Sequence, residues 1–122
     1  RLNAYAILRK MELLPEVKGS LIVLSRDELN RFHYTRGDTE GLVNKPLAIP
    51  GVEFSVFMRQ ESDCIRVSMR SRGDFPVNIL CIYYFGGVCH LNAAGGEFYG
   101  TLDDAVEHFK EKLPEIRKRF IE

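Results

Sequence analysis

The chain has 122 residues and a formal net charge of zero, because 17 Lys and Arg balance 17 Asp and Glu. This length fits one domain, and the 45% hydrophobic and 28% charged fractions are those of a globular protein. The balanced charge excludes a global attraction to nucleic acid or to membranes. No apolar run approaches the roughly 20 residues needed to span a bilayer, and no signal-peptide pattern is present. We therefore expect one domain, residues 1–122, with no membrane partner.

The chain has three cysteines, Cys64, Cys81 and Cys89, without the CxxC spacing of metal sites. This odd and sparse set is typical of reduced thiols and predicts a cytoplasmic protein. The sequence begins at Arg1 inside a helical pattern, which indicates a piece of a longer protein.

The first half of the chain predicts alternating helices and strands. Apolar residues at the spacing of one helix face predict a helix over Leu2 to Leu14. The continuous apolar run Leu21–Leu24 predicts a buried strand. Ser25 and Glu28 have the spacing of a capping box, which favours a short helix over residues 26–32. The remaining elements of this half are a polar loop over residues 33–39 and a short helix over residues 39–44.

Two strands, Phe54–Gln60 and Ile65–Arg72, are joined by a loop of hairpin size. Because the side chains of a strand alternate, the second strand has one apolar and one polar face. The residues of the polar face are Arg66, Ser68, Arg70 and Arg72. These arginines are either a solvated surface or a row of anion contacts, since a planar guanidinium suits bidentate phosphate binding.

A helix with its apolar face at Val77, Leu80, Cys81 and Tyr84 leads into the glycine-rich stretch 85–96. Clustered glycines let a ligand approach backbone N–H groups, which is how many phosphate-binding loops work. A plain turn between two elements is the alternative. A short strand over residues 97–99 and a helix that begins after Thr101 and kinks at Pro114 complete the chain. These elements predict an α/β fold, with a mixed β-sheet flanked by helices.

Two segments in this order resemble the C-terminal, DHH-associated domain of DHH-family phosphoesterases. The segments are Ser68-Met69-Arg70-Ser71 and, after a helix, Phe85-Gly86-Gly87-Val88-Cys89-His90-Leu91-Asn92-Ala93-Ala94-Gly95-Gly96. The upstream residues that are similar to one subgroup are Asp38, residues 40–44, Ile49 and residues 51–53. That subgroup contains the bacterial oligoribonucleases (nanoRNases) and 3'-phosphoadenosine 5'-phosphate phosphatases. The resemblance covers nearly the whole chain.

The resemblance implies a substrate-binding domain that faces a catalytic DHH domain with two Mn²⁺ ions. Arg70 and Ser71 match the Arg-Ser pair that contacts the substrate, and His90 matches the histidine that reaches the phosphate. The other expected phosphate-binding residues are Gly86, Gly87 and Asn92, with Ser68 and Arg72 as additional contacts. The metal-binding motif has no match in the chain. We therefore expect no catalytic or metal-binding residue in it, and no hydrolase activity from this chain alone.

The expected partners are short RNA or a nucleotide phosphate, the catalytic DHH domain of the same protein, and a second copy in a homodimer.

The chain departs from the family pattern at the residues before His90, where the family has glycines and this chain has Val88 and Cys89. A β-branched valine fits poorly where φ must be positive. Either the substrate binds differently, the loop is remodelled, or the site has decayed. The alternatives are thus a non-catalytic nucleotide-binding or regulatory module, or an exopolyphosphatase-like or cyclic-dinucleotide phosphodiesterase of the same family.

Overall fold

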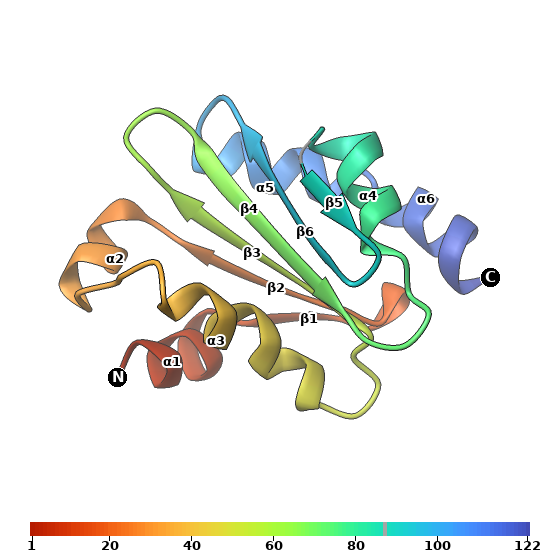
Figure 1. Ribbon diagram of the computed structural model, residues 1–122, viewed down its shortest axis with the longest axis horizontal. Coiled ribbons are helices and arrows are strands. Elements are labelled where there is room, and N and C mark those ends of the chain that lie inside the picture. The colour runs from red at the N-terminus through yellow and green to blue at the C-terminus, as the bar shows by residue number, and fades with distance from the viewer. Residues whose placement is uncertain (87) are drawn as a thin grey trace.

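A computed structural model describes residues 1–86 and 88–122, apart from the side chains of residues 82, 83 and 88–90. Within this part of the chain, six strands form one mixed sheet in the order β1-β2-β3-β4-β6-β5 (Figure 1). The strands are β1 Glu12–Leu14, β2 Gly19–Leu24, β3 Phe54–Gln60, β4 Ile65–Ser71, β5 Val88–His90 and β6 Ala93–Phe98. β2 and β3 pair in parallel, and the other neighbours pair antiparallel.

Helices lie on both faces of this sheet (Figure 1). They are α1 Leu2–Tyr5 with a π-helical continuation Ala6–Lys10, α2 Arg26–Arg31, α3 Asp38–Asn44, α4 Val77–Tyr84, α5 Leu102–Lys110, and α6 Leu113–Ile116 with a π-helical continuation Arg117–Ile121. Short 3₁₀ turns occupy Pro15–Val17 and Lys45–Ala48. Helices α1, α2 and α3 share one apolar cluster with β2 and β3, while α4, α5 and α6 pack on the other face. The predicted α/β fold with a mixed sheet flanked by helices is confirmed.

The helices cover the two faces of the sheet unequally, and part of one face is therefore polar. The cluster under α1, α2 and α3 takes its strand residues from β2 and β3, namely Ile22, Leu24 and Phe57. On β4, Val67 and Met69 are buried in the opposite cluster, whereas Arg66, Ser68 and Arg70 are half-buried. The polar half of the sheet face beside α3 is therefore formed by β4 and β6.

The predicted first helix is wrong at its C-terminal end. Helical structure stops at Lys10, and Glu12–Leu14 form β1, which pairs antiparallel with β2. The turn between these strands places Lys18 in the left-handed region, with φ 57°. Leu14 is buried and enters the core from this strand. Three residues are too few for periodicity alone to separate strand from helix.

The predicted glycine-rich loop is also wrong over most of its length, because its residues form the β5–β6 hairpin. Gly96 lies in β6, where an added Cβ would be 2.9 Å from the Cβ of Phe85 and 3.0 Å from its carbonyl oxygen. A glycine inside a strand often marks such a close approach of another segment. Gly96 therefore makes room for the packing of Phe85 against β6.

The cysteines differ in their chemical state. Cys64 is a free, buried thiol, whereas Cys81 is disulfide-bonded. The expectation of three reduced thiols is thus wrong for Cys81. An odd number of cysteines does not exclude one disulfide bond.

Among the described helices, none is long and apolar enough to cross a membrane.

The capping box at the start of α2 is confirmed. The Ser25 hydroxyl accepts from the Glu28 N–H at 3.2 Å, and the Glu28 carboxylate accepts from the Ser25 N–H at 2.9 Å. The Tyr5 hydroxyl and the Lys10 ammonium also bind this carboxylate. Partial burial raises the pKa of Glu28, but the bonds from Ser25, Tyr5 and Lys10 together lower it to about 2.

We expect Glu28→Gln to lower the free energy of unfolding by about 1–3 kcal/mol at pH 7. Because the folded-state pKa lies below the ordinary value of 4.5, this stabilisation is complete above pH 4.5 and lost as the pH falls towards 2. Urea unfolding of the full-length protein at a series of pH values measures it. Glu16→Gln, at an exposed position, is the control. A difference between wild type and Glu28→Gln that stays constant down to pH 2.5 would contradict the assignment.

Candidate functional site

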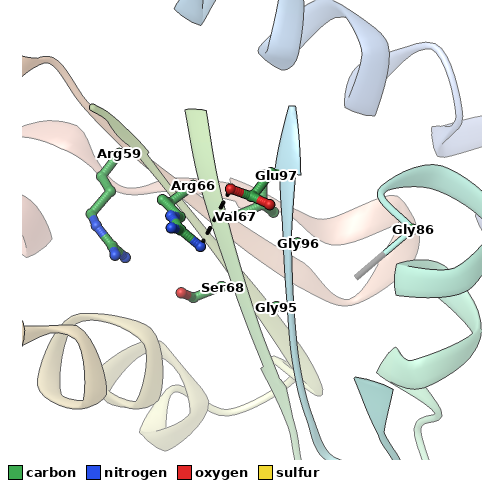
Figure 2. A pocket seen from close by; sticks show the side chains of 8 residues that line it. All are labelled: Arg59, Arg66, Val67, Ser68, Gly86, Gly95, Gly96 and Glu97. Atoms are coloured by element: carbon green, nitrogen blue, oxygen red, sulfur yellow. Dashed lines mark ion pairs between the residues drawn. The ribbon is translucent and has the colours of Figure 1, made fainter. Parts of the chain in front are cut away.

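A pocket of about 450 Å³ lies on the polar half of the sheet face. Its lining residues are Arg59, Arg66, Val67, Ser68, Gly86, Gly95, Gly96 and Glu97 (Figure 2). The strand pairing brings them together, because Arg66 is opposite Glu97 on β6 and opposite Arg59 on β3. Ser68 is opposite Gly95 in the same way. Three neighbouring strands thus contribute to one concave surface.

Carboxylates hold the two arginines of this pocket. The Arg59 side chain is only 9% exposed, and its Nε lies 3.0 Å from the Glu61 carboxylate. Its guanidinium carbon is 5.7 Å from the centre of the Tyr34 ring, in cation–π contact. Arg66 forms an ion pair with Glu61 at 3.5 Å. It forms a second ion pair with Glu97, also at 3.5 Å (Figure 2). The two guanidinium groups are therefore balanced by two carboxylates.

Arg70 lies further along the same face of β4, next to α3. Its Nη1 donates to the Met69 carbonyl at 2.8 Å, and its Nη2 forms an ion pair with Glu40. The Arg70 side chain is 20% exposed, while that of Glu40 is 65% exposed. The hydrogen bond from Arg70 lowers the pKa of Glu40, although slight burial raises it. Such an exposed ion pair contributes little to stability, so an incoming anion can displace Glu40 from Arg70.

Ser71 and Asn92 are not brought to the face of Arg70. Ser71 is 8% exposed and lies on the core face of β4, where its hydroxyl donates to the Phe75 carbonyl at 2.6 Å. The Asn92 amide donates to the Ser71 hydroxyl at 2.8 Å and to the Gly73 carbonyl at 3.1 Å. Both side chains thus hold the turn after β4 in place, and their contact with substrate stays a prediction.

Arg72 follows Ser71, the last residue of β4, and its N–H still donates to the Glu53 carbonyl at 3.0 Å. Its Nη1 donates to the Leu47 carbonyl at 2.7 Å. The Arg72 side chain thus reaches the 3₁₀ turn after α3, the helix whose Glu40 pairs with Arg70. Its expected contact with substrate stays a prediction.

The glycine-rich segment is described in part. Gly86 lies at the pocket in the left-handed region, with φ 59°. Gly87 and the side chain of His90 lie outside the described residues. The backbone register pairs His90 with Ala93, and Ala93 with Arg70. With about 4.8 Å between neighbouring strands, the His90 backbone is roughly 10 Å from that of Arg70, in the same cross-strand row.

We expect Asn92→Ala to lower the free energy of unfolding by about 1–3 kcal/mol, because the Gly73 carbonyl and the Ser71 hydroxyl lose a donor. Chemical denaturation of the full-length protein measures this loss. A matched substitution, Asn30→Ala at an exposed helical position, is expected to change stability by less than about 0.5 kcal/mol. A stable Asn92→Ala variant with weakened substrate binding would instead assign Asn92 to the substrate site.

Sequence reasoning missed Arg59, Glu97 and Glu40. Arg59 was detectable, because counting back from the hairpin closure at Gln60 and Ile65 pairs it with Arg66. Glu97 could be paired with Arg66 only once β6 was known to extend back to Ala93. Glu40 depends on the packing of α3 against β4, for which the sequence carries no local signal.

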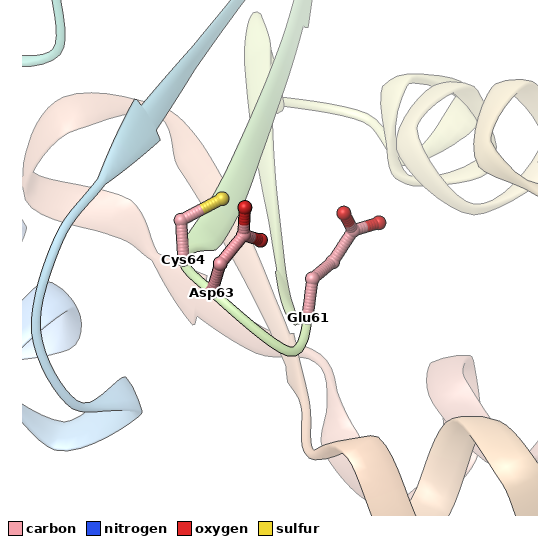
Figure 3. Close-up of side chains that lie close together, drawn as sticks. All are labelled: Glu61, Asp63 and Cys64. Carbon is pink, nitrogen blue, oxygen red and sulfur yellow. The ribbon is translucent and has the colours of Figure 1, made fainter.

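Among the described residues, one cluster has the atom types of a metal site. Glu61, Asp63 and Cys64 have ligand atoms within 4.8 Å of one another at the β3–β4 turn (Figure 3). Burial first, and then the charges of Asp63 and Glu97, raise the pKa of the Cys64 thiol. Glu61 is already bound by two arginines. Since Mn²⁺ prefers carboxylate and other oxygen ligands, these residues do not fit a Mn²⁺ centre.

No protein-family model matches the chain, and no curated protein matches it at a significant level. An exopolyphosphatase-related protein from Bacteroides fragilis has a solved structure to which the chain is similar over its whole length, with 42% identity and a TM-score of 0.92. A pGpG-specific phosphodiesterase from Vibrio cholerae matches over 96% of the chain, with 18% identity and a TM-score of 0.64. The second likeness shows the fold alone. The chain spans 36% and 38% of these two proteins. The likenesses agree with a DHH-associated domain in general and do not single out the nanoRNase subgroup.

Proposed function

We propose that the chain is the substrate-binding domain of a Mn²⁺-dependent phosphoesterase that hydrolyses short oligoribonucleotides, 3'-phosphoadenosine 5'-phosphate, or both. The observation that supports the proposal is the position of the Arg70 guanidinium and its hydrogen-bond partners. The guanidinium is held on the polar sheet face beside α3 by the Met69 carbonyl, and its one carboxylate partner, among the described residues, is the exposed Glu40. A fixed and accessible guanidinium is suited to bidentate binding of phosphate.

The cross-strand row of Arg70 supports the same proposal. His90 occupies that row by backbone register, and the resemblance assigns to this histidine a contact with the phosphate. Gly86, at the pocket beside it, has a backbone conformation that favours glycine. Together these positions provide donors for one phosphate group at the polar half of the sheet face.

The reaction itself requires residues outside this chain. The described residues offer no set that fits Mn²⁺, so we assign the metal to the catalytic DHH domain of the same protein. The likeness of the whole chain to about a third of a solved structure supports a multidomain parent. This chain would then bind and orient the phosphate across a cleft from the metal centre.

A second candidate is an exopolyphosphatase-like hydrolase. The observation that favours it is the 42% identity to an exopolyphosphatase-related protein. A row of arginines binds inorganic phosphates as well as it binds phosphodiesters, so Arg70 alone does not separate the two substrates.

Hydrolysis assays on the full-length protein test the proposal. With Mn²⁺ present, we expect cleavage of RNA oligomers of two to five nucleotides, or release of phosphate from 3'-phosphoadenosine 5'-phosphate. The matched assay uses inorganic polyphosphate under the same conditions. Turnover of polyphosphate alone would favour the second candidate, and no turnover of any of the three would leave the non-catalytic binding module.

A further inference from the structure

The pocket beside Arg70 has features that a phosphate site does not need. Its two guanidinium groups, on Arg59 and Arg66, are balanced by the carboxylates of Glu61 and Glu97. A second phosphate would therefore enter a pocket without net positive charge and next to a carboxylate. Because an unpaired buried charge is costly, this charge balance disfavours an anion and favours a neutral, polar ligand.

The pocket also combines a bare floor with polar walls. Gly95 has no side chain of its own, and among the described residues an added Cβ there would meet the Val67 carbonyl, at 3.5 Å. Arg66 supplies N–H donors, Glu97 supplies acceptors, and the Ser68 hydroxyl can do either (Figure 2). The volume of about 450 Å³ is within the range of small-molecule sites. A flat heterocycle with both donors and acceptors on its edge matches this arrangement.

We propose that this pocket binds one nucleobase of the substrate, with the base edge hydrogen-bonded by Arg66 and Glu97 and its ring over Gly95. Every nucleobase presents both donors and acceptors, and proteins that bind single-stranded RNA stack bases on guanidinium planes. The inference rests on the proposed function, because it takes the phosphate to lie at Arg70. Ser68 is two residues from Arg70 on the same face of β4, which is about 7 Å along the strand. That separation is within the span of one nucleotide.

This nucleobase pocket makes the domain selective for nucleotides over inorganic polyphosphate. A polyphosphate has no neutral heterocycle and would leave the pocket empty. The substrate class is therefore decided by Arg66 and Glu97, whereas Arg70 binds the phosphate that both substrate classes share.

Equilibrium binding to the full-length protein in EDTA tests the inference without hydrolysis. The probes are a 5'-phosphorylated diribonucleotide, the same backbone with abasic sugars, and inorganic tripolyphosphate. We expect the diribonucleotide to bind at least about tenfold more tightly than its abasic analogue. Glu97→Gln and Arg66→Gln should each weaken diribonucleotide binding by about tenfold. They should change the affinity for the other two probes by less than about twofold.

The matched control is Arg117→Gln, which breaks an exposed ion pair with Glu122 (3.2 Å) far along the chain and should leave all three affinities unchanged. Equal losses for tripolyphosphate and diribonucleotide would identify the pocket as an anion site and overturn the inference. Unchanged diribonucleotide affinity in both variants would also overturn it. Arg70→Ala separates the two proposals, since normal binding of all probes by that variant sinks the proposed function itself.

Discussion

Replacing Arg70 by alanine in the full-length protein is expected to lower kcat/KM on short RNA by about 100- to 1,000-fold. The substitution removes the fixed guanidinium from the open sheet face and leaves the phosphate without its bidentate donor. Arg70→Lys is expected to recover only part of this loss, because an ammonium is a point charge without the planar fork. Steady-state hydrolysis of a trinucleotide with Mn²⁺ measures both variants.

Glu40 provides a test with the opposite sign. Glu40 is paired with Arg70, where its carboxylate would compete with the phosphate that we propose to bind there. Glu40→Gln is therefore expected to lower KM several-fold while kcat changes little. The double variant with Arg70→Ala should show no such gain, since the competition then no longer exists. Arg117→Ala is the control for a lost surface arginine. A loss of activity in Arg117→Ala as large as in Arg70→Ala would show that net charge, and not the position of Arg70, determines binding.

The strands could be predicted where one face of the sheet is buried and the other is polar. β4 alternates between core residues such as Val67 and polar residues such as Arg70, and its predicted bounds miss by one residue. β3 is buried on both faces, and its β-branched and aromatic residues were sufficient to predict Phe54–Gln60. Local hydrogen bonds could also be predicted from the sequence, as the capping box at Ser25 shows.

The remaining elements depend on packing between segments far apart in the chain. Gly95 and Gly96 were predicted in a loop because glycine is uncommon in strands. β6 forms nonetheless, since β4 and β5 pair on either side of it, and Gly96 admits the Phe85 backbone. The residues of the candidate site also differ in whether local sequence or distant packing determines their position. Arg70 could be identified from its strand and motif. Glu40 reaches Arg70, and Glu97 reaches Arg66, only through tertiary pairing.

The same substitution is expected to change stability strongly at one of the two neighbouring glycines of β6 and hardly at the other. Gly96→Val should lower the free energy of unfolding by about 2–4 kcal/mol, because its Cβ would lie 2.9 Å from the Phe85 Cβ and 3.0 Å from the Phe85 carbonyl oxygen. Gly95→Val should leave stability nearly unchanged, because among the described residues its Cβ meets the Val67 carbonyl at an ordinary 3.5 Å and valine favours strands. Urea unfolding of the full-length variants measures this difference.

Binding then separates packing from ligand recognition. The valine of Gly95→Val would cover the floor of the nucleobase pocket, so diribonucleotide affinity should fall about tenfold or more while the fold stays intact. Binding of tripolyphosphate, which needs Arg70 and not this floor, should be retained. A Gly95→Val variant that binds diribonucleotide as tightly as the wild type would place the base elsewhere. In that case the β6 glycine at position 95 would serve only the close pairing of β4 with β6.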